Sequence, residues 1–415
     1  MAAPAHFTQL VLAAALAATV ATAQPPIPAG PPFDVPSQSL GDQERADVGR
    51  AADGGFVVVW EGSDGSTSSV FGRRFAPGGE PLGDDFQISV AVGASQQRPR
   101  VAVAPEGGFL VVWEGFAPEP VEYNVYARAY GAAGAPLGPP RLVPSVYLGD
   151  QYSADVAAEP GGSFVVVWQT YAGYVDPVFG RSFDAQGEPL GEEFRLDPEF
   201  DWSDGPAVAA TGPGEFVVAY HAYEAGYGYT SLLAGQKFDL SGNLQGAAFR
   251  IDPDDDQYRR DPQIAADAQG NFVVVWQESY YTTSLYARRF AADGTPAGDP
   301  VPLDGEPDYG ARVALAVAPN GDAHVAWNDS EATLSARFLP ATGGPVEPVA
   351  VAGEGELAWD PGVAVDASGS PVFVWSSWRV NSEMDVLARR FVAEEPFFED
   401  GFDGGGPDRW SLVVP

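Results

Sequence analysis

The chain has 415 residues, with 57 acidic against 22 basic side chains, a formal net charge of −35 and no cysteine. An acidic surface of this strength repels phosphate backbones and anionic lipid, which argues against nucleic acid as a partner. Without cysteine, disulfides and thiolate metal sites are excluded, so the core must hold the fold alone.

Residues 1–23 are expected to be a signal peptide. The apolar run at 10–23 ends in Ala21-Thr22-Ala23, a small-x-small cleavage pattern that precedes Gln24. The run of about 14 residues is shorter than the roughly 20 that a membrane span needs, and no later stretch reaches transmembrane length. The sequence therefore predicts a protein without a transmembrane segment that is secreted, periplasmic or held at the cell surface.

A short apolar strand that ends in an aromatic residue recurs along the rest of the chain. Typical copies are GFVVVW at 55–60 and NFVVVW at 271–276. Successive copies lie about fifty residues apart, and such a period built of strands indicates a repeat architecture. The seven aromatic anchors are Trp60, Trp113, Trp168, Tyr220, Trp276, Trp327 and Trp375.

Each repeat is predicted to form four strands, separated by Gly-rich and Pro-rich turns. In the second repeat these are RVAVAP (100–105), FLVVWEG (109–115), YNVYARAY (123–130) and APLGPPRLVP (135–144). Small sheets that are apolar on both faces must be covered by neighbours, as in a β-propeller. A solenoid would have shorter repeats, and sandwich domains need about 100 residues. The sequence predicts an all-β, seven-bladed propeller of four-stranded antiparallel blades over residues 24–395.

The two ends of the repeat region are complementary. The seventh repeat supplies three strands and lacks a fourth, whereas residues 33–51 read as a fourth strand that runs into a first. That segment matches residues 141–158 closely, including a shared LGDQ. Residues 32–37 are therefore expected to complete the last blade and close the ring by strand pairing.

The repeat signature, VVVW followed by ARRF and G-x-PLG, resembles that of secreted bacterial repeat proteins of β-propeller type over about 360 residues. The resemblance implies the fold and says little about activity. The tail at 396–415 contains DGFDGGGPDRW and is similar to the short DGF-G-W endings of some secreted proteobacterial proteins. This implies a sorting tag, with a disordered terminus as the alternative.

An arginine recurs in the third strand of nearly every repeat. Because a residue repeated by the scaffold is more often structural than functional, we expect these arginines to pair with acids or to stack on aromatic rings between blades. They are Arg73, Arg128, Arg181, Arg288, Arg337 and Arg389, with Gln236 at this place in the fourth repeat.

A ligand site is expected on one face of the ring. Turns between strands one and two, and between three and four, are short and alike, whereas the other loops vary and are rich in aromatic and acidic residues. Aromatic rings can stack on pyranose faces and carboxylates accept hydrogen bonds from hydroxyls, although the aromatics could equally shield blade edges. The candidate ligand-binding residues are Asp201, Trp202, Asp204, Tyr223, Tyr227, Tyr258, Tyr280, Trp359 and Trp378.

Calcium is the one cofactor that the sequence suggests. Asp252, Asp254 and Asp256 occupy positions 1, 3 and 5 of an oxygen-ligand loop. The match is partial, because Gln257 stands where glycine is wanted and no glutamate follows at position 12. The alternative is a solvated acidic loop.

No catalytic residue can be assigned from the sequence. Acids are so abundant that no pair stands out, and a serine triad would need His221 or His324 without any G-x-S-x-G elbow. The sequence therefore favours an exported, monomeric, non-catalytic scaffold that binds carbohydrate or a protein partner. The alternatives are a secreted polysaccharide hydrolase or lyase and a structural surface protein.

Overall fold

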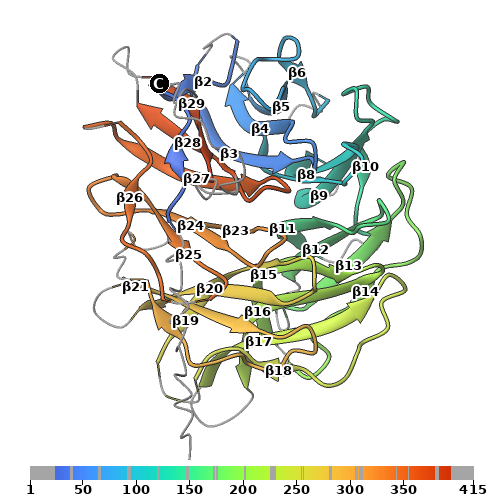
Figure 1. The fold of residues 1–415 in the computed structure, drawn as a ribbon. Helices are drawn as coiled ribbons and strands as arrows, with labels where there is room; N and C mark the ends of the chain where they lie inside the picture. The colour runs from blue at the N-terminus through green and yellow to red at the C-terminus, as the bar shows by residue number, and fades with distance from the viewer. Residues whose placement is uncertain are drawn as a thin grey trace, which may run out of the picture.

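The computed structural model describes residues 24–37, 41–63, 67–90, 95–118, 121–145, 149–171, 173, 176–200, 202–224, 230–253, 255, 257–279, 283–303, 307, 312–342, 344–353, 355–378 and 383–393. The regular elements of this part of the chain are all β-strands, arranged in seven small antiparallel sheets (Figure 1).

The sheets are numbered here as blades 1 to 7. Blade 1 consists of β3 (Gln43–Arg50), β4 (Phe56–Ser63), β5 (Ser68–Phe75) and β6 (Phe86–Gln87), and blade 2 of β7 (Gln96–Val103), β8 (Phe109–Pro118), β9 (Val121–Tyr130) and β10 (Arg141–Leu142). Blade 3 consists of β11 (Asp150–Ala158), β12 (Phe164–Tyr171), β13 (Val178–Phe183) and β14 (Phe194–Arg195), and blade 4 of β15 (Trp202–Gly212), β16 (Glu215–Glu224), β17 (Thr230–Asp239) and β18 (Phe249–Arg250). Blade 5 consists of β19 (Arg259–Ala266), β20 (Phe272–Ser279), β21 (Thr283–Phe290) and β22 (Val301–Pro302), and blade 6 of β23 (Val313–Val317), β24 (Ala323–Asn328), β25 (Leu334–Leu339) and β26 (Val349–Ala350). Blade 7 consists of β27 (Ala358–Val365), β28 (Pro371–Trp378) and β29 (Met384–Val392), with β1 (Ile27–Pro28) and β2 (Phe33–Asp34) on its outer edge.

The blades stand side by side in a closed ring, and the predicted seven-bladed propeller is confirmed. The first strand of each blade contacts the first strand of the next, from β3 round to β27, and β27 contacts β3. Seven hydrophobic clusters each combine side chains of two adjacent blades, so every sheet is covered on both faces by its neighbours. The core is therefore divided among seven interfaces between blades.

The N-terminal segment closes the ring, as predicted. Phe33 and Asp34 of β2 pair with Ala388 and Leu387 of β29, and the Val35 amide donates to the Val386 carbonyl at 3.0 Å. In addition, β1 pairs with the end of β29, where Ile27 faces Val392. Figure 1 shows β2, near the blue end of the chain, beside the red β29. Both short strands together replace the missing fourth strand of blade 7.

The fourth strands are shorter than the sequence suggested. The segment APLGPPRLVP contributes only Arg141–Leu142 to blade 2, and its Pro136 forms an isolated bridge to Tyr130. Proline cannot donate to a strand ladder, so a Pro-rich segment can only touch the sheet at points. Short outer strands of this kind also leave little free edge for another chain to pair with.

The repeated aromatic anchors fill the interfaces between blades. Trp276 is 1% exposed, and its ring stacks on Tyr286 of the third strand at 6.0 Å between centroids. Trp60 and Phe71 make the equivalent contact at 6.3 Å, and the tyrosine anchor of blade 4, Tyr220, is equally buried.

The recurrent arginines hold the blades to one another, and their predicted structural role is confirmed. Arg288 donates from Nε to the Gly298 carbonyl at 2.9 Å in its own blade, and from Nη1 to the Ile251 carbonyl at 2.8 Å in the preceding blade. Its guanidinium also lies over the ring of Phe290. The main hydrogen-bond partners of the recurrent arginines are backbone carbonyl oxygens, whereas the sequence analysis expected acidic side chains. Arg73, Arg128, Arg181 and Arg389 repeat the same two bonds.

Candidate functional site

The exposed aromatic side chains of the described residues gather on one face of the ring. This loop face is the end of the blades that carries the connections between second and third strands and from fourth strands to the next blade. Buried rings fill the blade interfaces, so an exposed ring here is available to a ligand. The aromatic side chains that are more than a third exposed, all on the loop face, are Tyr171, Trp202, Tyr258 and Trp378.

Three of the predicted ligand-binding residues, Trp202, Tyr223 and Tyr258, lie together on the loop face of blades 4 and 5. Trp202 begins β15 and packs edge-on against Tyr223 of β16, with ring centroids 6.1 Å apart at 80°. The His221 ring lies 4.5 Å from that of Tyr223 and 5.5 Å from that of Tyr258, which precedes β19 of blade 5. These candidates come from stretches that flank the consecutive fourth and fifth repeats, and the structure places them together.

Asp204 completes this group through a contact with the histidine. Residues 204 and 221 face each other in the β15–β16 ladder, and Asp204 Oδ1 lies 3.1 Å from His221 Nδ1. Directly after Asp204 the strand has a β-bulge, with Gly205 at a φ of +56°. The first strands of blades 1, 2, 3, 5 and 7 have the same bulge, so it belongs to the scaffold and does not by itself mark a site. We call Trp202, Asp204, His221, Tyr223 and Tyr258 the blade 4–5 site.

The buried side of the blade 4–5 site contains an unsatisfied nitrogen. His221 is 1% exposed, and its Nε2 has no hydrogen-bond partner among the described residues. If Nδ1 carries the proton and donates it to Asp204, Nε2 is left as an acceptor. Burial and the bond to the Tyr258 side chain raise the pKa of Tyr223, so its hydroxyl stays protonated at neutral pH and can donate.

Further acids and a tyrosine surround the site, and the sequence analysis missed Tyr152, Asp176 and Asp261. Asp176 forms a parallel bridge with Trp202, and its carbonyl accepts from the Ser203 amide at 3.0 Å. Burial, followed by the charge of Asp204, raises the pKa of Asp176. Burial also raises the pKa of Tyr152, whereas Asp261 lies half exposed at the rim, with Oδ2 3.6 Å from Arg260 Nε. The site is therefore a patch of aromatic rings with crowded carboxyl groups.

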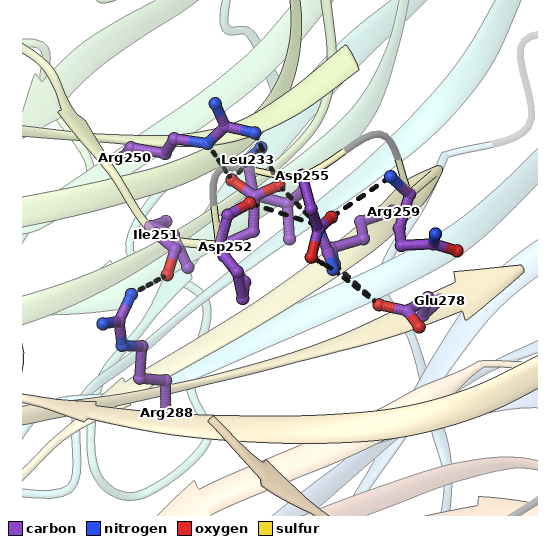
Figure 2. Close-up of polar contacts among 10 residues, drawn as sticks. Leu233, Arg250, Ile251, Asp252, Asp255, Arg259, Glu278 and Arg288 are labelled. Atoms are coloured by element: carbon purple, nitrogen blue, oxygen red, sulfur yellow. Dashed lines mark hydrogen bonds and ion pairs between the residues drawn. The ribbon is translucent and has the colours of Figure 1, made fainter. Parts of the chain in front are cut away.

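The acidic loop at 252–261 is neutralised in part by arginine side chains of the protein. Figure 2 shows Asp252 between Arg250 and Arg259, with Arg250 Nε 3.0 Å from Oδ1 and Arg259 Nη1 3.2 Å from Oδ2. Arg259 is 3% exposed and also binds Asp255, at 2.7 Å, and Glu278, at 2.8 Å. The bond from Arg259 lowers the pKa of Asp255.

This arrangement bears on the calcium hypothesis. The Asp252 side chain is fully buried and engaged by two arginines, so it serves an ion-pair network that the sequence did not reveal. Asp254 and Asp256 lie outside the described residues, and calcium at those two positions stays a prediction. Within the described ranges, no group of three or more acidic or histidine side chains is placed to hold a metal ion.

Two of the remaining candidates lie on another blade, and three are not described. Trp359 and Trp378 pack together on blade 7, with ring centroids 6.5 Å apart at 86°. Asp201, Tyr227 and Tyr280 lie outside the described residues. The predicted ligand face thus divides into the blade 4–5 site and a separate tryptophan pair on blade 7.

The inner wall of the ring carries a charge cluster that the sequence analysis did not find. Arg312 of blade 6 reaches past blade 7 to blade 1, where Nη2 binds Asp47 Oδ1 at 2.6 Å and Nη1 binds the Ala46 carbonyl at 2.7 Å. Asp47 also accepts from the Val101 amide, and burial followed by the charge of Arg312 lowers the pKa of Arg100. These charges are matched within the protein and tie non-adjacent blades together.

Comparisons with known proteins support the fold. No family model matches the chain, and no curated protein sequence matches it. Across the described part of the chain, no helix is long and apolar enough to cross a membrane. Among solved structures, an ulvan lyase bound to -[GlcA(1-4)Rha3S]- aligns with a TM-score of 0.55 at 10% identity, over 88% of this chain and 96% of its own.

Two further structures align at the same level of identity. A protein of unknown function from Dyadobacter fermentans gives a TM-score of 0.53 at 10% identity, over 88% of this chain and 98% of its own. The β-propeller domain of the Trilobed protease from Pyrococcus furiosus gives 0.52 at 10% identity, over 86% of this chain and 100% of its own. At this identity the likeness establishes that the chain shares the β-propeller fold with these proteins.

Proposed function

We propose that this protein is an exported, non-catalytic binding scaffold that recognises carbohydrate at the blade 4–5 site. The observation that carries the proposal is the convergence of Trp202, Tyr223 and Tyr258, from two blades, around Asp204 and His221. Aromatic rings offer apolar faces to a pyranose ring, while a carboxylate and tyrosine hydroxyls can exchange hydrogen bonds with its hydroxyl groups.

The charge of the site restricts the ligand. Burial and then the charge of Asp204 raise the pKa of Asp176, and the whole chain has a net charge of −35. A uronate or sulfate group would add like charge to this patch, whereas neutral hydroxyls would not. We therefore propose a neutral glycan. The ulvan lyase supports the class of ligand, since it uses the same fold to bind an oligosaccharide, although the sugar in that case is acidic.

Calorimetric titration with a panel of neutral oligosaccharides tests the proposal. Trp202→Ala and Tyr258→Ala remove exposed rings and are expected to weaken binding by about tenfold or more, with little change in melting temperature. The matched control is Leu137→Ala, because Leu137 is 46% exposed outside this site. Unchanged affinity in both aromatic variants would exclude this site, and silence of the wild-type protein across the panel would favour a protein partner.

A polysaccharide hydrolase or lyase is the second candidate, favoured by one observation. Asp204 orients His221 through Nδ1, as a carboxylate orients a general base, and the buried, unpartnered Nε2 would have to be uncovered for it to meet a substrate. Release of reducing ends or of unsaturated products, lost in His221→Gln and Asp204→Asn, would establish this function. Binding without turnover supports the scaffold, and neither binding nor turnover is expected of a purely structural surface protein.

Export is part of the proposal and can be tested separately. Removal of residues 1–23 is expected to leave Gln24 as the first residue of the mature chain. N-terminal sequencing of the protein recovered from the medium or the cell envelope checks this. A retained N-terminus in the cytoplasm would contradict it.

A further inference from the structure

A cavity lies on the loop face of blade 7, at the seam where the ring closes. Its volume is about 320 Å³. The closing segment supplies Phe33 and Asp34, β28 supplies Trp378, and β29 supplies Leu387, with Glu356 from the loop before β27. The wall is thus shared between the two ends of the propeller.

The side chains of this seam cavity suit a sugar ring. Trp378 is 47% exposed and is held by the edge-to-face contact with Trp359, so it offers a positioned aromatic surface. Glu356 is fixed on both oxygens, since Oε1 accepts from Trp375 Nε1 and Oε2 from the Gly353 amide, each at 3.0 Å. A carboxylate oxygen has two lone pairs, so each can accept a further bond from a ligand hydroxyl.

The cavity also has the balance of surfaces expected of a small-ligand site. Phe33 and Leu387 add apolar wall next to the tryptophan, and Asp34 adds a second carboxylate. The volume falls at the lower end of the range usual for ligand pockets, which corresponds to one or two sugar units. Among the described residues, the wall holds two carboxylates and no lysine or arginine, a balance that favours neutral hydroxyls over acidic groups.

The seam cavity is separate from the blade 4–5 site. Blade 6 stands between blades 5 and 7 on one side of the ring, and blades 1 to 3 stand between them on the other. One sugar unit cannot contact both places, but a polysaccharide that engages both would gain from the second contact as an intramolecular event.

We propose that the seam cavity is a second carbohydrate-binding site, which takes a neutral pyranose unit and strengthens closure of the ring when occupied. The class of ligand rests on the proposed function, whereas the position and the effect on closure rest on the cavity. Phe33 and Asp34 line it only while β2 pairs with β29, so a bound sugar makes these two contacts only in the closed form and binds that form more tightly. A ligand that binds one form stabilises that form by mass action.

The test compares two variants over the same panel of neutral oligosaccharides. Trp378→Ala removes the aromatic surface of the seam cavity, and the double variant Trp202→Ala/Tyr258→Ala removes that of the blade 4–5 site. Calorimetry of the wild-type protein is expected to show two sites per chain, one lost in each variant. Hydrogen exchange measures closure: a bound oligosaccharide is expected to slow exchange of the β2 and β29 amides in the wild type and in the double variant, and not in Trp378→Ala.

Each outcome bears on one proposal or the other. Binding that is lost in the double variant and unchanged in Trp378→Ala would leave the proposed function standing and overturn the seam site. The reverse pattern would support the seam site and remove the blade 4–5 site. Binding at the seam without protection of β2 would overturn the coupling to closure, and no binding by any protein would overturn both sites.

Discussion

His324 gives the fold a specific sensitivity to acid. It is 2% exposed in β24 of blade 6, its ring lies 5.3 Å from that of Phe338, and its Nε2 has no partner among the described residues. Burial lowers the pKa of His324 from 6.5 to about 4, partly offset by the nearby charge of Asp322. The other repeats have an aliphatic residue three positions before the anchor: Val57, Leu110, Val165, Val217, Val273 and Val372.

The sign of the effect follows from the two pKa values. The unfolded chain takes up a proton at His324 near pH 6.5 and the folded chain only near pH 4, so acid favours unfolding between these values. The contribution of the neutral histidine is complete above pH 6.5 and is lost progressively as the pH falls through 4. The gap between the two values corresponds to about 3 kcal/mol of unfolding free energy.

His324→Val isolates this contribution, because valine is the residue that other blades use and it does not titrate. Urea unfolding of both proteins at about pH 7 and about pH 4.5 gives the loss of stability of each. Carboxylates contribute equally to both losses, so the wild-type loss is expected to be larger by about 2.5 kcal/mol. Equal losses in the two proteins would refute the reasoning and mean that His324 is protonated in the folded state.

Three other changes test the fold and the ion pairs. Trp276→Ala is expected to destabilise the protein by about 3–5 kcal/mol in urea unfolding, because it empties a buried interface, and near-neutral behaviour would contradict the anchor role. Arg259→Gln leaves buried Asp252 with one arginine fewer and is expected to lower the free energy of unfolding by about 3 kcal/mol. Adding Asp252→Asn to the same chain is expected to restore part of this loss, and no recovery would argue against the ion-pair network. Deletion of residues 24–35 removes both closing strands and exposes the edge of β29, so a lower melting temperature and aggregation are expected in size-exclusion runs, whereas an equally stable monomer would refute closure.

The fold could be predicted from the sequence because the same strand pattern, which ends in an aromatic anchor, occurs seven times. The regular distance between Trp60 and its counterparts determines the number of blades, and the match of residues 33–51 to residues 141–158 determines the closure. The number of blades and the closure of the ring both follow from repeated local patterns, which can be read from a single sequence. The neighbourhood of Trp202, Tyr223 and Tyr258 followed in turn, since consecutive repeats become adjacent blades.

The finer contacts depend on register, which the sequence does not display. Arg259 pairs with Asp252 and Glu278 because the fold brings these residues together at the start of blade 5. In the sequence alone, the spacing of the aspartates resembles that of metal ligands. Asp176 reaches Trp202 through a bridge between two blades that no repeat pattern announces. The site could therefore be located to a pair of blades in advance, whereas its acids and their partners required the structure.

The arginine contacts between blades have a direction, and this has a consequence for how such rings can change. Arg288 of blade 5 holds the carbonyl of Ile251 at the end of blade 4, and Arg128 holds Ile88 of blade 1 in the same sense. Five repeats thus present an arginine donor to the preceding blade, a head-to-tail interface that their copies can satisfy in the same way. Duplication or loss of a whole cassette, cut between the same two points of adjacent repeats, would preserve every such contact.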